Sequence, residues 1–303
     1  MKILFNYLIF PGFIFSAVIG LLALWLDRKI TARLQWRVGP PWYQNFADII
    51  KLFGKDIITP QTARLTFLLS PYLGLLGLVL ATTILGQAVS LNFTGFTGDI
   101  IVVLYLLLMP AISLIIGASA CGNPLASVGA SREMKLVLAY ELPLILCVIT
   151  VIIKAAGAIK LGQVVFTQAA SSSFIFSFSG AIAFIVALIS AQAKIGLPPF
   201  DISEAEQEIM AGVLIEYSGL PLAVYKLSKA ILIYALPLFI IILFMGRDLS
   251  PVFISAKFLL IILIFSLVKN TNPRLRIDQA MRFFWGPVTL LAAVSVIFAV
   301  LGK

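Results

Sequence analysis

Eight long apolar stretches constrain the fold of this chain more than any other feature of its sequence. A helix needs about 20 mostly apolar residues to cross a bilayer. Only 12% of the 303 residues are charged, against about a quarter in soluble proteins, so the chain has too little polar surface to fold in water. The sequence predicts an all-α polytopic membrane protein, a single integral-membrane domain over residues 1–303, with transmembrane helices at about 3–26, 67–91, 100–121, 134–153, 174–193, 221–245, 252–268 and 285–301.

Two residue counts exclude several kinds of site. The chain has no histidine, so a reaction that needs an imidazole base or an imidazole metal ligand must use another subunit. Its two cysteines exclude a disulfide framework and a four-cysteine cluster. We therefore expect no catalytic residue, no metal site and no cofactor in this chain.

Charge is distributed unequally over the connections between the predicted helices. Four connections alternate along the chain and so share one side: 27–66, 122–133, 194–220 and 269–284. The positive-inside rule places this side in the cytoplasm and both termini outside. Eleven of the 13 acidic residues also lie in these connections or the adjoining helices, so this face is either a docking surface or a solvated face with compensating ion pairs. It carries 16 of the 22 basic residues: Arg28, Lys29, Arg33, Arg37, Lys51, Lys55, Arg64, Arg132, Lys135, Lys194, Lys226, Lys229, Lys269, Arg274, Arg276 and Arg282.

A short amphipathic helix is predicted after the turn at Gly39-Pro40-Pro41. Its apolar residues recur at i, i+3, i+4 and i+7, and it is too short and too charged to span a bilayer, so we expect it in the cytoplasmic membrane interface. The helix is either a plain anchor or one wall of a slot between membrane and cytoplasm. The apolar face is Phe46, Ile49, Ile50 and Phe53, the aromatic anchors are Trp36, Trp42 and Tyr43, and the slot would have Arg37, Asp48 and Lys51 at its mouth.

Five carboxylates crowd into residues 198–216, which read PPFDISEAEQEIMAGVLIE. On a helix that begins near Ser203, Glu206 would complete an S-x-x-E capping box. Capping and the helix dipole account for two or three of the acids, but not for Glu208 and Glu216 in their apolar context. On such a helix one acidic face would be formed by Asp201, Glu204, Glu208 and Glu216.

A second acidic group follows Arg132, where Glu133 precedes the fourth predicted span and Glu141 lies about 12 Å further along the helix. A carboxylate inside a bilayer is costly and is by default a candidate functional group. We interpret Glu141 as a proton relay, with a structural ion pair as the alternative. Lys226 and Lys229, near the start of the sixth span, are its possible partners.

Four stretches carry a resemblance to a known family. They are 37–63 (RVGPPWYQNFADIIKLFGKDIITPQTA), 129–143 (GASREMKLVLAYELP), 199–219 (PFDISEAEQEIMAGVLIEYSG) and 272–281 (NPRLRIDQAM). In this order and at these spacings, the chain resembles subunit 1 of respiratory complex I and its counterpart in energy-converting membrane-bound NiFe hydrogenases, including formate hydrogenlyase. The resemblance covers nearly the whole chain, and eight spans agree with the core of that family.

The resemblance implies a multi-pass subunit of an oxidoreductase complex in the cytoplasmic membrane of a prokaryote, not catalytic alone. The implied partners are antiporter-like membrane subunits, a hydrogenase-like large subunit and an iron–sulfur small subunit; the last two would carry the NiFe centre and the iron–sulfur clusters. The implied proton or ion path comprises Glu133, Glu141, Asp201, Glu204, Glu208, Glu216, Lys226 and Lys229. The implied docking face, or mouth of a quinone-like cavity, comprises Arg28, Arg37, Asp48, Lys51, Arg132, Arg274, Arg276 and Asp278.

Two stretches bear on the branch of the family. Residues 193–198 read AKIGLP, where quinone-linked members usually carry an Asn-Arg-type stretch, and the connection 269–276 looks more like the hydrogenase branch. The prediction is a membrane component of a ferredoxin-linked hydrogenase that couples electron transfer to H⁺ or Na⁺ translocation. The alternatives are a quinone-binding complex I subunit, the equivalent subunit of a membrane-bound sulfane-sulfur reductase, a purely structural anchor, and a stand-alone transporter, whose inverted repeats we do not find in the sequence.

Overall fold

The computed structural model describes residues 2–60, 63–89 and 95–302, and within these ranges every regular element is a helix. Eight segments of this part of the chain are long and apolar enough to cross a membrane, which confirms the predicted polytopic all-α fold. They are α1 (Lys2–Leu8) with α2 (Phe13–Leu34), α4 (Arg64–Val89), α5 (Asp99–Leu106) with α6 (Met109–Ala120), α7 (Pro124–Lys154), α9 (Phe178–Ile195), α11 (Gly219–Phe244), α12 (Pro251–Thr271), and α13 (Ile277–Phe283) with a π turn (Phe284–Val288) and α14 (Thr289–Val300).

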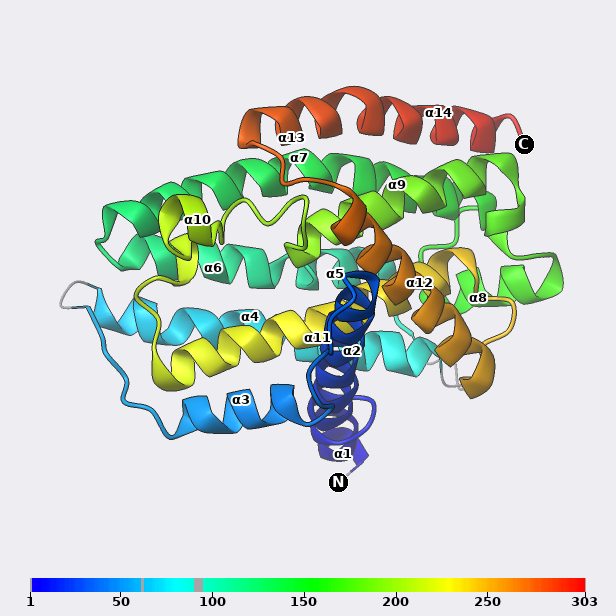
Figure 1. The fold of residues 1–303 in the computed structure, drawn as a ribbon. Coiled ribbons are helices and arrows are strands. Elements are labelled where there is room, and N and C mark those ends of the chain that lie inside the picture. The colour runs from blue at the N-terminus through cyan, green and yellow to red at the C-terminus, as the bar shows by residue number, and fades with distance from the viewer. Residues whose placement is uncertain (1, 61–62, 90–94, 303) are drawn as a thin grey trace.

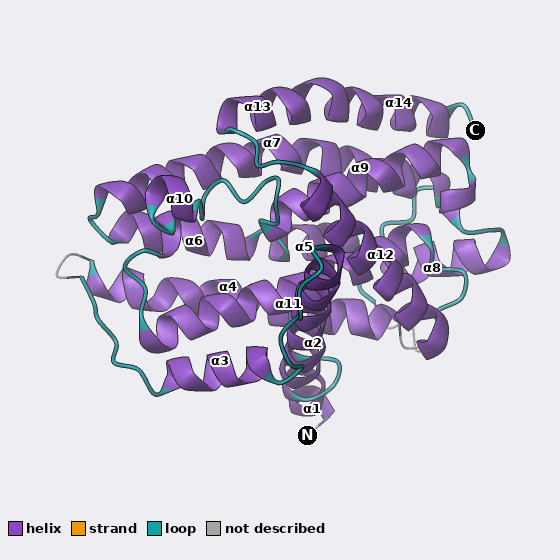
Figure 2. Ribbon diagram, in the orientation of Figure 1, coloured by secondary structure: helices purple, strands orange, loops and turns teal. Residues whose placement is uncertain are grey.

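Helix α11 forms the centre of the molecule (Figure 1). Its sequence is apolar around nearly the whole helix, and most of its residues are buried, as expected of a helix with neighbours on every side. It packs against α2 and α4 on one side and against α9 on the other. Helices α7, α9 and α14 pack together as a second group, which Figure 2 shows above α11.

The four charged connections meet on one side of the helix bundle, as their alternation along the chain predicted. Gln35 donates a hydrogen bond to Asn270 (3.0 Å), which joins the first connection to the last. The backbone N–H of Ile58 donates to the Ser218 hydroxyl (2.9 Å), which joins the first connection to the third. The third also contacts the start of α7, where Asn123 donates to Glu216 (2.6 Å).

Helix α7 is longer than predicted. It begins at Pro124 instead of 134, because the side chain of Asn123 caps it by accepting from the Leu125 N–H (2.9 Å) and proline is favoured in the first turn. Arg132 and Glu133 therefore lie in the helix and not in a connection. The expectation that they lie in a loop was wrong, because the first turns of α7 are too polar to be recognised by hydropathy.

The predicted connection 154–173 contains a further helix, α8 (Leu161–Ala170). Its buried Gln168 donates to the carbonyls of Ile242 (3.0 Å) and Leu243 (3.1 Å) and accepts from the Gly246 N–H (2.7 Å). These carbonyls belong to the last turn of α11, which has no hydrogen-bond partners inside its own helix. Helix α8 thus caps the central helix.

The predicted amphipathic helix is present as α3 (Gln44–Phe53). Its buried face differs from the predicted one, because Asn45, Ile49 and Leu52 are buried, whereas Ile50 is 70% exposed and Phe53 51% exposed. Asn45 is held inside by donating to the Leu21 carbonyl of α2 (2.9 Å). Helix α3 therefore packs Asn45, Ile49 and Leu52 on the bundle, with Phe46 partly buried against it, and presents Ile50 and Phe53 outward.

The prediction of one helix with one acidic face over 203–216 was wrong. The segment folds into a short helix, α10 (Glu206–Ile209), and a 3-10 turn (Gly212–Leu214). Between them the chain reverses through positive φ at Met210 and Ala211, and Gly212, the first residue of the 3-10 turn, also has positive φ. The residue before α10 is Ala205, so Ser203 does not cap it; the side chain of Glu206 lies outside the described part of the structure. The acids point to separate basic or amide partners, which a single helical face would not reach.

Candidate functional site

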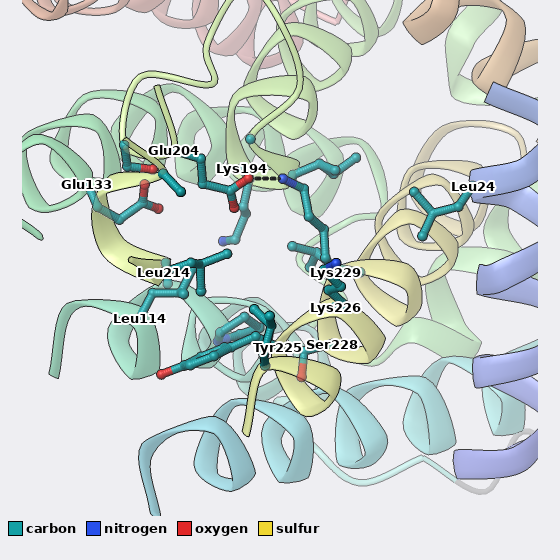
Figure 3. Close-up of a pocket in the computed structure, with 18 of the residues that line it drawn as sticks. Leu24, Leu114, Glu133, Lys194, Glu204, Leu214, Tyr225, Lys226, Ser228 and Lys229 are labelled. Atoms are coloured by element: carbon teal, nitrogen blue, oxygen red, sulfur yellow. Dashed lines mark hydrogen bonds and ion pairs between the residues drawn. The ribbon is translucent and has the colours of Figure 1, made fainter. Parts of the chain in front are cut away.

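A cavity of about 510 Å³ lies where α2, α3, α7, α9, α11 and the segment 196–214 meet. Figure 3 shows its inner part, with Glu133, Glu204 and Lys194 on one wall and Lys226 and Lys229 projecting from α11. The volume is within the range of about 300–1,000 Å³ that is usual for small-molecule sites. The charged residues that line it are Arg28, Asp48, Glu133, Lys194, Glu204, Lys226 and Lys229.

Acids and bases at the cavity form ion pairs. Lys229 donates to Glu204 at 2.6 Å (Figure 3). Arg28 lies 3.8 Å from Asp48, whose other carboxylate oxygen accepts from the Gln44 amide at 2.9 Å. Four of the predicted path residues, Glu133, Glu204, Lys226 and Lys229, thus share one cavity with Arg28 and Asp48 of the predicted mouth.

Behind the cavity lies a nearly inaccessible ion pair between α9 and α7. Lys194 donates to Glu141 Oε2 at 2.9 Å, and their side chains are 1% and 13% exposed. Within the described residues, Glu141 Oε1 and the Tyr140 hydroxyl have no hydrogen-bond partner, although the Lys194 ammonium lies 5.8 Å from the centre of the Tyr140 ring. Because removing two charges from water is costly, each member of this pair depends on the other to compensate its buried charge.

Lys194 is a residue that the sequence prediction missed, and the prediction that Lys226 or Lys229 pairs with Glu141 was wrong. Helix α9 packs directly against α7, whereas Lys226 and Lys229 face the cavity from α11. The sequence carried a usable signal, because Gly196 (φ 69°) ends α9. A glycine at this position commonly terminates a helix, so Lys194 could have been assigned to its last turn.

The other predicted path acids lie away from the cavity. Asp201 Oδ1 accepts from Arg274 Nε at 2.8 Å, and its carbonyl accepts from the same guanidinium at 2.9 Å. Glu208 pairs with Arg132 at 2.6 Å, and Glu216 accepts from Asn123. These acids fasten the segment 197–218 to α7 and to the connection before α13. The predicted path acids therefore fall into separate groups. Glu133 and Glu204 line the cavity, whereas Asp201, Glu208 and Glu216 hold the segment 197–218 to its neighbours.

Three buried hydroxyls lie beside the cavity and were not predicted. Ser70 Oγ lies 3.0 Å from the hydroxyls of both Tyr217 and Tyr225, and Tyr225 also lines the cavity. A Cβ atom on Gly117 would lie 2.1 Å from the Tyr217 hydroxyl, so only glycine leaves room for this group. Burial raises the pKa of Tyr217, which keeps it a neutral hydroxyl that fixes the segment 212–218 to α4.

Comparison with known proteins identifies the architecture. A family model described as NADH dehydrogenase matches residues 6–300. The chain belongs to the NADH dehydrogenase family. An NADH-quinone oxidoreductase subunit from Anoxybacillus flavithermus is 31% identical over 301 residues, which cover 94% of this chain and 88% of that protein. The same subunit from Thermomicrobium roseum is 31% identical over 326 residues, covering 97% and 95%.

A solved structure extends the similarity to the fold. A chain of the membrane-bound sulfane sulfur reductase, an archaeal respiratory membrane complex, superposes with a TM-score of 0.82 at 28% identity, covering 99% of this chain and 100% of that chain. This NADH dehydrogenase family member is therefore a subunit-1-type membrane component of a complex I-like oxidoreductase, which confirms the resemblance found in the sequence.

The remaining residues of the predicted docking face lie on the surface of this family member, outside the cavity. Arg37, Lys51, Arg276 and Asp278 are all exposed, and Trp36 beside Arg37 is 98% exposed. Arg132 and Arg274 are engaged by Glu208 and Asp201 instead. In the described ranges, no group of three or more potential ligands comes close enough to hold a metal ion.

Replacing Arg274 with glutamine is expected to loosen the segment 197–218. The change removes hydrogen bonds to a carboxylate that is only 22% exposed, so we expect a loss of about 1–2 kcal/mol in local stability after allowing for partial exposure. Hydrogen exchange on the purified complex should show faster exchange of amides near Asp201. Arg276→Gln, an exposed arginine two residues away, serves as the control. Equal rates of amide exchange near Asp201 in the two variants would contradict the role of Arg274 in holding this segment in place.

Proposed function

We propose that this chain couples electron transfer in a neighbouring redox arm to the translocation of H⁺ or Na⁺. The observation that carries the proposal is the Lys194–Glu141 ion pair directly behind the cavity. Lys194 belongs to both places, because it lines the cavity and binds Glu141 on α7. A charge that enters or leaves the cavity acts on this pair at short range and in a low dielectric, where electrostatic interactions are strong.

The ion pairs offer a route from the cavity mouth inward. Arg28–Asp48 lies at the α3 side, Lys229–Glu204 at the inner wall, and Lys194–Glu141 between α9 and α7. When one member of such a series gains or loses a proton, its partner is free to engage the next group. We assign the path to Glu133, Glu141, Lys194, Glu204 and Lys229, and we assign Asp201, Glu208 and Glu216 to holding the wall of the cavity in place.

We further propose that the redox arm is of the ferredoxin-linked hydrogenase type. Support comes from the stretch 193–198, whose Lys194 forms the buried pair, and from the connection 269–276. In this proposal the NiFe centre and the iron–sulfur clusters lie in a hydrogenase-like large subunit and an iron–sulfur small subunit, antiporter-like subunits continue the path, and this chain holds no cofactor. The arm docks on the face of the four charged connections, which is cytoplasmic, and both termini lie outside.

A membrane-bound sulfane sulfur reductase is the second candidate. It is favoured by the structural match over the full length of a subunit of that complex. Purification of the intact complex, followed by assays of hydrogen evolution from reduced ferredoxin, of polysulfide reduction and of inhibitor-sensitive quinone reduction, separates the candidates. Inhibitor-sensitive quinone reduction would overturn the assignment to the hydrogenase branch.

Replacing Glu141 with glutamine is expected to uncouple the complex. The amide keeps the shape of the side chain but cannot exchange a proton, so the rate of coupled ion transport should fall by about 10²-fold, the lower range for loss of a positioned proton-transfer group. The measurement is ion uptake into vesicles that contain the assembled complex. Glu208→Gln, an acid paired with Arg132 outside the cavity, is the matched control. Unchanged transport in Glu141→Gln would refute the relay role.

A further inference from the structure

Asp27 is a buried carboxylate near the end of α2 that belongs to neither the predicted path nor the predicted docking face. Its side chain is 5% exposed, and each of its oxygens accepts a hydrogen bond from α12. Oδ1 accepts from the Ser266 hydroxyl and Oδ2 from the Lys269 ammonium, both at 2.8 Å. Because removing one partner of a buried ion pair leaves an uncompensated charge, the ends of α2 and α12 resist separation here.

The contact continues along both chains toward the charged connections. Thr31 and Gln35 follow Asp27 at i+4 and i+8, so the three side chains lie on one side of α2. Asn270 of α12 donates to the Thr31 hydroxyl at 3.2 Å and accepts from the Gln35 amide at 3.0 Å. Arg28, the neighbour of Asp27, lines the cavity. Helix α12 therefore holds the part of α2 that forms one wall of the cavity.

The connection that leaves α12 then fastens another wall. Arg274 donates to Asp201 through Nε at 2.8 Å, and the Leu275 N–H donates to the Pro199 carbonyl at 3.1 Å. Glu204, which lines the cavity, follows three residues after Asp201. Figure 3 shows Glu204 on one side of the cavity and Leu24 of α2 on the other. One stretch of chain, 266–275, thus holds two walls that face each other.

Between its two attachments this stretch is short and restrained. Helix α12 reaches Thr271. The next residue, Asn272, donates to the Val268 carbonyl through its side-chain amide at 2.9 Å and through its backbone N–H at 3.2 Å. The ring of Pro273 then restricts its own φ. A displacement at one attachment therefore reaches the other, since the link between them has little slack.

We propose that residues 266–275 form a brace between the two walls of the cavity, with Asp27 and Lys269 as positioning residues for Glu204. A movement of the end of α2 passes along the brace to the segment 197–204. A movement of that segment passes back to α2, because coupling between two sites is reciprocal. The two walls therefore shift together. The brace requires no particular redox arm and no proton relay, so it stands or falls apart from the proposed coupling function.

The test is hydrogen exchange on the intact complex, measured by mass spectrometry of peptides from the segment 197–204. Asp27→Asn keeps the shape of the side chain but removes the charge that holds Lys269. Amides of the segment should then exchange at least about fivefold faster, which is the lower end of the usual coupling between sites. Exchange at the α2–α12 contact should rise as well.

A double variant distinguishes a brace from two independent contacts. In Asp27→Asn with Arg274→Gln, the segment 197–204 should exchange no faster than in Arg274→Gln alone, because the link is already broken at its far end. Independent contacts would instead give free-energy effects that add, so that the two accelerations multiply.

Lys257→Gln is the matched control, because Lys257 also lies on α12 but at its other end. It donates to the carbonyls of Met245 and Asp248, both at 2.7 Å. Its replacement should speed exchange near Asp248 and leave the segment 197–204 unchanged.

A milder variant keeps the test decisive if Asp27→Asn fails to assemble. Asn270→Ala removes the contacts with Thr31 and Gln35, and it should speed exchange in the segment 197–204 by about twofold or more, as for loss of ordinary hydrogen bonds. Unchanged exchange of the segment in Asp27→Asn, or in Asn270→Ala where that variant replaces it, would overturn the brace. So would multiplied rates in the double variant, or an equal acceleration by Lys257→Gln.

Discussion

Replacing Lys194 with methionine is expected to lower the free energy of unfolding of the membrane subunit by about 3–5 kcal/mol, the usual cost of removing one partner of a buried ion pair. The Glu141 carboxylate would remain between α7 and α9 at 13% exposure, and one of its oxygens already lacks a partner within the described residues. Coupled ion transport should be lost as well, because Lys194 connects Glu141 to the cavity. Thermal denaturation and ion uptake by the assembled complex measure the two effects.

A double variant separates stability from coupling. In Lys194→Met with Glu141→Gln neither side chain is charged, so most of the lost stability should return, because neutral replacement of both members of a buried pair is often nearly neutral in free energy. Coupling should not return, since no proton-exchanging group is left at this position. The Lys194 assignment would fail if the double variant were as unstable as Lys194→Met, or if Lys194→Met alone kept its stability and its transport.

A Gly20→Ala substitution is expected to force α2 away from α11. A Cβ atom at this position would lie 2.2 Å from the Ala230 carbonyl oxygen and 2.6 Å from its carbon, both of them backbone atoms that cannot rotate aside. Small residues allow such close approach of helices in membranes, and overpacking a close contact costs about 1–3 kcal/mol. Both helices line the cavity, through Arg28 and through Lys226 and Lys229, so coupled turnover should fall together with the melting temperature.

The matched control for this substitution is Gly286→Ala. Gly286 lies in the last membrane segment, its φ is not positive, and an added Cβ would meet nothing within 4 Å. Its melting temperature should stay close to that of the unmodified complex. If the Gly20→Ala and Gly286→Ala variants had the same melting temperature, the close contact between α2 and α11 would not limit stability.

Hydropathy was sufficient to predict the eight membrane segments, because burial in lipid requires apolar residues over a whole span. It was not sufficient for their ends. The start of α7 depends on a polar cap at Asn123 and a helical polar stretch that continues to Glu133, and neither is apolar. Helix α8 was missed for a related reason, since it is too short to span and is stabilised by contacts with α4 and α11.

The candidate site was predicted in part. Residue type together with the resemblance to a known family identified Glu133, Glu204, Lys226 and Lys229, which the fold brings to one cavity. The helical-wheel argument for residues 203–216 failed because it considered only local geometry, whereas partners distant in sequence decide where each carboxylate points. The partner of Glu141 could not be read from the chain, since it depends on the packing of α9 against α7.

The tether between Asp201 and Arg274 also constrains the order in which the protein can be completed during synthesis. The two residues are 73 positions apart in the sequence. Because a ribosome adds about 5–20 residues each second, Arg274 is synthesised roughly 4–15 seconds after Asp201. During this interval the segment that walls the cavity lacks its fastening to the connection before α13. A nascent chain that ends before this connection therefore lacks the contact that fastens the segment 197–218 to the connection before α13.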